Sequence, residues 1–177
     1  MMPIAPLMIE HRLIERMVKI IKSKLQTDDI NDFDANFVNT AIDFIRTYAD
    51  KCHHGKEEDI LFKQLEKKKL QPSHGKLLYE LVREHAWARK KVAGVSKALE
   101  RFYEGDKEAI DDMISGLREL VEFYPRHIEK EDKHFFLPVM DYFTSEERDN
   151  MLEECREFDR KFIHERYRML LEELERN

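Results

Sequence analysis

The chain has 177 residues, which is enough for one domain with a substantial core. Hydrophobic residues make up 42% and charged residues 38%, with only five Gly and five Pro, and this composition favours a mostly helical protein. The net charge of −6 argues against nucleic acid as a partner, and no apolar run approaches the roughly 18–20 residues that a membrane helix needs. We therefore expect a helical protein that binds neither nucleic acid nor membranes.

The two cysteines, Cys52 and Cys155, make no disulfide framework. The N-terminus lacks the charged region and following apolar run of a signal peptide. These features predict a cytoplasmic protein with free thiols, in which Cys52 is a small buried residue.

The first predicted helix runs from about residue 7 to 25. Its apolar positions are spaced alternately by four and three residues, as in the core-facing seam of a bundle, and His11 occupies one of them. A polar connection over residues 27–32 leads to a second helix from about 33 to 69. Its phasing is ambiguous, because His54 and Glu58 fall to one side of the stripe formed by residues 41, 45, 48 and 52.

A third helix is expected to begin after the turn at residues 71–73, with Ser73 as its N-cap, and to carry His85 in a second alternating seam that ends near residue 103. The Gly-Asp pair at 105–106 precedes a fourth helix over about 107–136, which Pro125 should bend just before His127. A fifth helix is expected over about 145–175. Its apolar residues include Phe158, Phe162, Leu170, Leu171 and Leu174.

Long helices joined by short links predict an all-α fold, an up-down-up-down four-helix bundle with an additional C-terminal helix. We expect the bundle to occupy residues 1–143. Residues 144–177 should form a helix that packs on the bundle, on a partner protein or on a second copy of the chain.

A histidine-containing pattern occurs twice. His54 is followed four residues later by Glu58, and His127 is followed in the same way by Glu131. His11 and His85 precede these two pairs at nearly equal distances, and each follows a glutamate. Because residues four apart share one face of an α-helix, each histidine–glutamate pair can reach a common point. We expect six side chains to converge in one pocket: His11, His54, Glu58, His85, His127 and Glu131.

Several residues near these six leave alternatives open. His53 and Glu57 form a rival pair with the same spacing, but only His54 and Glu58 align with the later repeat. A single helical histidine is more often a hydrogen-bonded core residue than a ligand, so the inference depends on all six residues together. Tyr124 could reach the pocket or be a plain core aromatic. Glu10 and Glu84 could accept hydrogen bonds from histidines, although a solvated helix face is favoured for both.

The combination of imidazole and carboxylate groups suits iron, zinc or manganese. Burying six ionisable side chains in a bundle core without a metal would be costly. Four histidines and two carboxylates in a two-fold arrangement therefore predict a site for two metal ions.

These residues resemble the hemerythrin-like family, whose members are also called HHE cation-binding domains, over about residues 7–140. The segments 58–62 and 127–132 carry the resemblance. It implies a four-helix bundle that holds two iron ions with an oxo or hydroxo bridge, bound by the histidines and Glu58 named above and by a carboxylate of the fourth helix. That carboxylate is Glu131 according to the internal repeat, or Asp132 according to its position in oxygen carriers.

One position departs from the oxygen-carrying members, which have His-x-x-x-His on the third helix. Arg89 stands at the second of these positions here. We therefore expect a di-iron protein that responds to or reacts with oxygen, peroxide, nitric oxide or iron rather than carrying oxygen. A di-iron oxidase or peroxidase is one alternative, and a metal-stabilised protein-interaction module is another.

Overall fold

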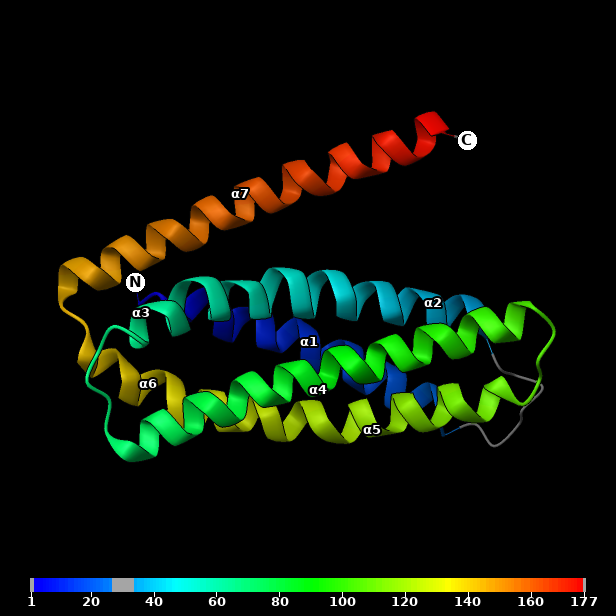
Figure 1. The fold of residues 1–177 in the computed structure, drawn as a ribbon, viewed down its shortest axis with the longest axis horizontal. Helices are drawn as coiled ribbons and strands as arrows, with labels where there is room; N and C mark the ends of the chain where they lie inside the picture. The colour runs from blue at the N-terminus through cyan, green and yellow to red at the C-terminus, as the bar shows by residue number, and fades with distance from the viewer. Residues whose placement is uncertain (1, 27–33, 177) are drawn as a thin grey trace.

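The computed structural model describes residues 2–26 and 34–176, with side chains through residue 162. Its regular elements in this described part are all helices, with no strand. Figure 1 shows four long helical segments lying side by side, with sequence neighbours running in opposite directions, and a fifth, α7, that diverges from them. The predicted all-α four-helix bundle with an additional C-terminal helix is confirmed.

The first bundle helix, α1 (Ile4–Lys24), begins slightly before its predicted start. The second is a continuous run of α2 (Ala35–Phe44), η2 (Ile45–His54), η3 (Glu57–Phe62) and α3 (Lys63–Leu65). The Asp34 side chain caps its beginning by accepting hydrogen bonds from two backbone N–H groups at 3.0 and 3.1 Å. The predicted start at Phe33 lies outside the described residues.

Two stretches of this second helix, η2 and η3, are π-helical. The Gly55 N–H, for example, donates to the carbonyl of Asp50, five residues earlier. A π-helical turn holds more residues than the 3.6 of an α-helical turn, so side chains in these stretches do not follow the i, i+4 spacing assumed for the sequence. This difference decides which side chains of the helix face the bundle interior.

The third bundle helix is α4 (Pro72–Tyr103). Gln71 is its N-cap residue and Pro72 occupies the first turn, so the expectation that Ser73 caps this helix is wrong. Proline suits this position because its fixed φ is helical and the first N–H groups of a helix have no internal partner. The fourth helix runs through α5 (Ala109–Lys130), η4 (Glu131–Phe135) and α6 (Phe136–Val139), and Pro125 lies inside α5. A short 3₁₀ turn, η5 (Met140–Tyr142), follows.

The fifth helix, α7 (Ser145–Arg176), begins with a reciprocal cap. The Glu147 N–H donates to the Thr144 hydroxyl at 3.2 Å, and the Thr144 N–H donates to the Glu147 carboxylate at 2.9 Å. Met151 and Cys155 are buried against the bundle, and Phe158 packs beside them. The side chains of the predicted apolar residues Leu170, Leu171 and Leu174 lie outside the described part.

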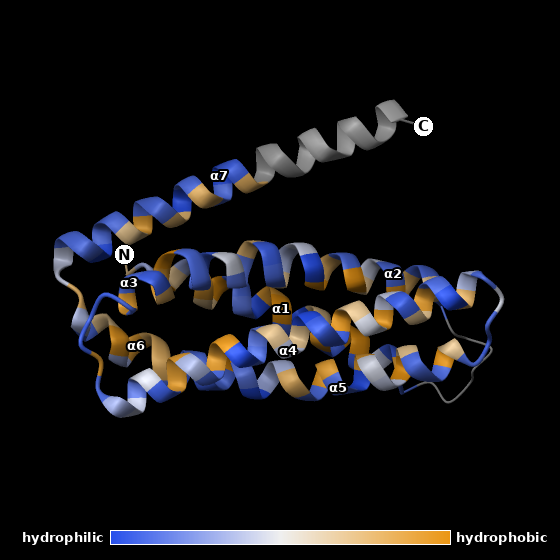
Figure 2. Cartoon of the chain, viewed as in Figure 1, coloured by the Kyte–Doolittle hydropathy of each residue, from blue (hydrophilic) through white to orange (hydrophobic). Residues whose placement is uncertain are grey.

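Hydrophobic residues gather where the bundle helices face one another, and hydrophilic residues cover the outer faces (Figure 2). The buried apolar residues form two separate clusters, one toward each end of the bundle. On α1, for example, Leu7 belongs to one cluster and Ile14 to the other, with His11 between them. The same order holds on α4, where His85 lies between Leu81 of one cluster and Val92 of the other. A polar layer therefore separates the two apolar cores.

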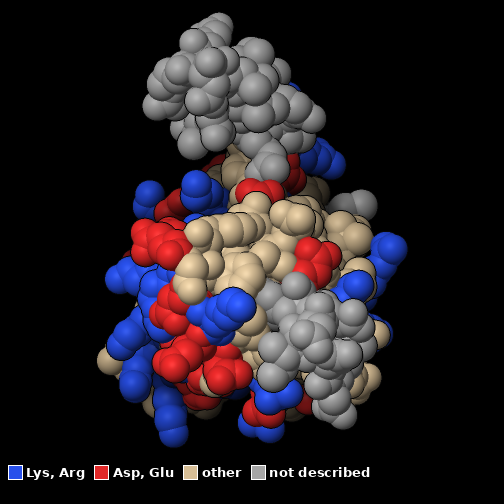
Figure 3. All heavy atoms as spheres, turned by 90° about the vertical axis from the view of Figure 1, so that its right-hand side faces the viewer, with Lys and Arg blue, Asp and Glu red and all other residues tan. Residues whose placement is uncertain are grey.

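Charged residues on the outer faces are of both signs. On the end of the bundle shown in Figure 3, Lys and Arg side chains lie intermixed with Asp and Glu side chains. Exposed pairs of this kind, such as Lys133 with Glu129, are screened by water and contribute little to stability. The stability of the fold therefore depends chiefly on the two apolar clusters.

Candidate metal centre

The polar layer between the two apolar clusters contains five histidines and two glutamates, all buried. The first group consists of His54, His85 and His127, and the second of His11, His53, Glu57 and Glu131. Within each group, one nitrogen or oxygen atom of every residue lies within 4.8 Å of those of the others. None of the seven residues is more than 2% exposed. The bundle thus brings side chains from all four of its helical segments into one interior site.

Five of the six residues expected from the sequence lie in these groups, and Glu58 does not. The Glu58 carboxylate lies on the outer side of the site, where it accepts a hydrogen bond from His85 Nδ1 at 2.7 Å. Glu57 takes the inner position, and His53 lies beside His54. The structure therefore places Glu57, and not Glu58, on the interior side, because the π-helical turns direct His53, His54 and Glu57 inward together.

The sequence contained a signal for this arrangement, since His53 and Glu57 were the rival pair with identical spacing. The structure also distinguishes the two candidate carboxylates of the fourth helix, Glu131 and Asp132. Glu131 is fully buried in the second group, whereas Asp132 lies outside it and bonds His11 Nδ1 at 2.8 Å. Asp132 is therefore not one of the inward-facing carboxylates.

Each of the five histidines turns its Nδ1 atom outward to a carboxylate oxygen. The separations range from 2.7 to 3.2 Å. A carboxylate only accepts hydrogen bonds, so each Nδ1 is the donor and each Nε2 atom faces inward. The pairs are His11 with Asp132, His53 with Glu10, His54 with Asp50, His85 with Glu58, and His127 with Glu84. Glu10 and Glu84 are thus acceptors for histidines, not members of a solvated helix face.

Each of these five carboxylates is paired in turn with a lysine or arginine. Burial raises the pKa of Glu10, Glu58 and Glu84, but the neighbouring histidine and cation outweigh it, so the pKa of each lies below its ordinary value. These three glutamates therefore stay ionised at neutral pH and fix the orientation of their imidazoles. The cations are Arg12 for Asp132, Lys56 for Glu10, Arg89 for both Asp50 and Glu58, and Lys130 for Glu84.

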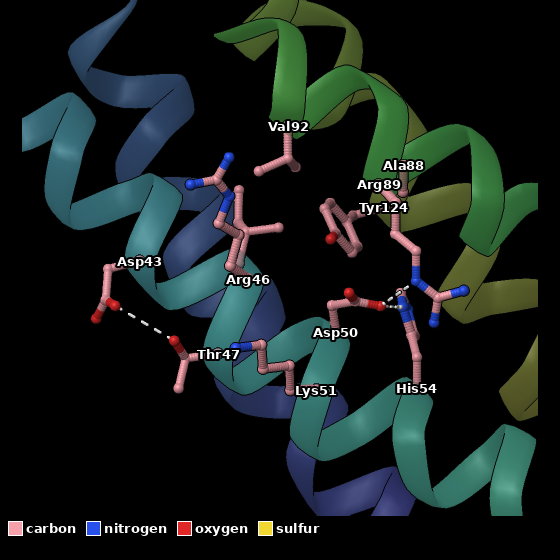
Figure 4. Close-up of a pocket in the computed structure, with 11 residues that line it drawn as sticks. Asp43, Arg46, Thr47, Asp50, Lys51, His54, Ala88, Arg89, Val92 and Tyr124 are labelled. Atoms are coloured by element: carbon pink, nitrogen blue, oxygen red, sulfur yellow. Dashed lines mark hydrogen bonds and ion pairs between the residues drawn. The ribbon is translucent and has the colours of Figure 1, made fainter. Parts of the chain in front are cut away.

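Arg89 stands at the position where oxygen-carrying members of the resembled family have a second histidine on the third helix. Its Nε donates to Asp50 at 2.7 Å and one terminal nitrogen donates to Glu58 at 2.9 Å. Figure 4 shows Asp50 between Arg89 and His54, with both interactions drawn. One guanidinium therefore holds the carboxylates that orient His54 and His85, and His53 brings the number of inward histidines to five.

The inward-facing atoms have no hydrogen-bond partner in the described part of the chain. They comprise the Nε2 atoms of all five histidines and both carboxylate oxygens of Glu57 and Glu131. Buried polar groups left in this state are costly, and native proteins rarely keep so many together. A positive ion among them would satisfy lone pairs and carboxylate charges at once.

The two carboxylates lie between the two groups. Glu57 is 3.5 Å from His53 Nε2 and 3.4 Å from His85 Nε2. Glu131 is 3.2 Å from His11 Nε2 and 3.3 Å from His127 Nε2. Each carboxylate thus reaches one histidine of either group through its two oxygens. Each carboxylate could therefore be shared between cations held by the two groups.

Some of the inward groups carry a proton in the metal-free protein, and a bound cation would displace it. Burial, with the charge of Glu131, raises the pKa of Glu57 well above its ordinary value. Burial also opposes ionisation of Glu131, but His127, His11 and His85 outweigh it and hold that pKa well below its ordinary value. Burial and neighbouring histidines lower the pKa of His54, which keeps it in the neutral form that binds metals. The residues present therefore fit a site for two cations.

The comparisons with known proteins agree with this geometry. The profile of the hemerythrin HHE cation binding domain matches residues 2–138. The chain belongs to this family. No curated protein and no solved structure matches it. Membership makes this a cation-binding bundle, and the matched segment contains every residue of the two groups.

A third cluster of possible ligands is already occupied by a side chain. Glu10, Cys52 and Asp159 lie close together at the contact between the bundle and α7. The fully buried ammonium of Lys56 bonds both Glu10 and Asp159 there, so this cluster carries its own cation. Within the described residues, no helix combines the length and apolar character needed to cross a bilayer.

Proposed function

We propose that this hemerythrin HHE domain holds two iron ions and responds to, or reacts with, a small oxidant or ligand such as oxygen, peroxide or nitric oxide. The observation that carries the proposal is the set of inward Nε2 and carboxylate atoms without hydrogen-bond partners. His54, His85 and His127 would hold one ion, and His11 and His53 the other, with Glu57 and Glu131 shared. Such a pair of ions supplies redox chemistry and positions for small ligands.

The protein's own residues hold and protect this centre. The five outward carboxylates keep each histidine in the tautomer that offers Nε2 to the interior. The two apolar clusters exclude water above and below the site. Phe62 stacks on His85 and Phe136 stacks on His11, at ring-centroid distances of 5.8 and 5.6 Å, so aromatic side chains cover two of the histidines.

The sequence argument against oxygen carriage relied on Arg89 replacing a histidine. Because His53 joins the site, the number of histidines no longer supports that argument. A different observation favours a responsive role. Glu10 bonds His53 on the inner side and Lys56 on the outer side, and Lys56 bonds Asp159 of α7. A short series of contacts therefore connects the site with the helix that leaves the bundle.

Metal analysis of the purified protein tests the centre. We expect two iron ions per chain and charge-transfer absorption bands, whereas zinc would give none. Glu57→Gln should lose at least one ion, and the matched variant Glu58→Gln should keep both, because Glu57, unlike Glu58, lies between the two histidine groups. Fewer than two ions in the unaltered protein, or equal losses from the two variants, would refute this assignment.

A response of α7 to the state of the metal centre can be measured at Cys155. This residue is 3% exposed and lies in the contact of α7 with the bundle. If the state of the site affects α7, the alkylation rate of Cys155 should differ between oxidised, reduced and chelator-treated protein in a Cys52→Ser background. Equal rates in all three states would exclude this coupling. Rapid loss of added peroxide would instead favour the oxidase or peroxidase alternative.

Removing the C-terminal helix tests the alternative that the protein is a metal-stabilised interaction module. It predicts that deletion of residues 144–177 abolishes partner binding or dimer formation while metal content stays unchanged. That the chain binds neither nucleic acid nor membranes stays a prediction, and the metal proposal depends only on the described bundle residues.

A further inference from the structure

A pocket of about 580 Å³ lies on the side of the bundle between η2 and α4. His54 and Tyr124 belong to its inner wall, and only 1% and 2% of their surfaces are exposed. The wall of the pocket therefore includes the outer side of the metal centre. Its size is within the range of sites for small organic molecules.

Among the described residues, the Tyr124 hydroxyl is the one buried side-chain group without a hydrogen-bond partner that does not belong to the metal centre. In Figure 4 the hydroxyl points into the space between Arg46 and Asp50, not toward the histidine groups. A buried hydroxyl without a partner is unfavourable, so an acceptor atom of a ligand in this pocket would satisfy it.

The charges around the pocket favour an anion. Three cations and two carboxylates line it. Asp50 is already bonded by Arg89, and Asp43 accepts from Thr47 at 3.2 Å. No ion pair within the described residues engages Arg46 or Lys51, so these two rim cations remain available.

The remaining wall is apolar. Ile45, Ala88 and Val92 are buried members of the pocket lining, and the ring of Tyr124 lies with them. We propose that the pocket binds a small aromatic or aliphatic carboxylic acid with a second oxygen, of the oxo- or hydroxy-acid class. The carboxylate faces Arg46 and Lys51, the apolar body covers Val92 and Ala88, and the second oxygen accepts a hydrogen bond from Tyr124. This proposal does not depend on which metal the centre holds.

Three probes of nearly equal shape test the proposal by isothermal titration calorimetry on the protein as purified. These are 4-acetylbenzoate, which has both features, 4-ethylbenzoate, which lacks the second oxygen, and 4-methylacetophenone, which lacks the charge. We expect 4-acetylbenzoate to bind about fivefold tighter than 4-ethylbenzoate and about tenfold tighter than 4-methylacetophenone.

Variants assign each preference to its residue. Tyr124→Phe keeps the ring and should abolish the difference between 4-acetylbenzoate and 4-ethylbenzoate. The double variant Arg46→Gln/Lys51→Gln should reduce the preference for the charged probe. Arg126→Gln is the matched control, because Arg126 lines a different pocket beside His127.

The wild-type probe series decides the question even if a variant fails to fold. No binding of 4-acetylbenzoate at 10 mM, or equal affinities for the three probes, would overturn the proposal. It would also be overturned if Arg126→Gln changed the affinities as much as the rim variant does. Metal content is measured separately, so failure of this pocket proposal is distinguishable from failure of the metal centre.

Discussion

Asp159 of α7 lies 2.6 Å from the ammonium of Lys56, which is fully buried beside the histidines of the second bundle helix. Next to this ion pair, Gly55 lets the ring of Phe158 approach the second bundle helix closely, because a Cβ atom at position 55 would lie 2.9 Å from that ring. The ion pair and the close approach at glycine together fix the first half of α7 against the bundle.

Removing the Lys56 charge should destabilise the protein by about 3–5 kcal/mol, because Glu10 would be left as a buried carboxylate without its cation. Asp159→Asn should cost no more than about 1 kcal/mol, since the Asp159 side chain is 41% exposed. Denaturant unfolding of Lys56→Met and Asp159→Asn measures both. Lys161→Met, at an exposed α7 position, is the control and should leave stability unchanged.

The contribution of this ion pair should not vary between pH 6 and 9. Burial lowers the pKa of Lys56, but Glu10 and Asp159 raise it more, so the net shift is upward. A raised lysine pKa gives stability that is present below the unfolded value of about 10.4 and is lost only above it. The net pKa of Glu10 is lowered, so its contribution is lost only as pH falls below about 4.3. Unfolding at pH 6, 7.5 and 9 should give the same difference between Lys56→Met and wild type.

Arg89 should affect metal affinity without being a ligand. Because it holds both Asp50 and Glu58, Arg89→Ala should weaken metal binding roughly 10–100-fold. Arg89→Lys should recover only part of this loss, because an ammonium cannot form the same fork. Competition with a chelator measures the affinity. Arg83→Ala, at an exposed position two residues before His85, serves as control. Equal effects of the Arg89 and Arg83 variants would contradict this role.

Metal removal should lower the thermal midpoint at pH 7.5. A metal present at about 100 times its dissociation constant stabilises the fold by about 2.7 kcal/mol, or roughly 5–10 °C for a chain of this size. The shift should shrink at pH 5, where protons compete for the ligand atoms. Burial lowers the pKa of His11, but Asp132 and Glu131 outweigh it and raise it to about 9 in the metal-free protein. Metal affinity should therefore rise with pH up to about 9, and melting curves with and without chelator will show whether it does.

Both thiols should be unreactive in the folded protein at pH 8. Burial raises the pKa of Cys52 and of Cys155 to about 11, and their exposed fractions are 7% and 3%. A thiol reagent should modify neither cysteine in native protein within minutes and both at once after denaturation. Immediate reaction of Cys155 in native protein would show that α7 does not stay against the bundle.

The sequence by itself determined the helices, the bundle and most of the site. Apolar spacing of three and four residues is a local property, and it placed His11 and His85 in core-facing positions, where the structure has them. The four-residue spacing of His127 and Glu131 likewise lies in α5 and at the start of η4, and both side chains face inward. These features need only the geometry of one helix.

Only the tertiary structure decided between Glu57 and Glu58. The π-helical turns of η2 and η3 change the angle between successive side chains, and no local pattern of residues 45–62 indicated them. The partner of Glu10 and the role of Arg89 were also beyond the sequence. Each acts through a residue on another helix, His53 for Glu10 and Asp50 for Arg89, and such pairings exist only after the helices pack. Side-chain periodicity is set within a helix, but the partners of a buried charge are set by the packing of several.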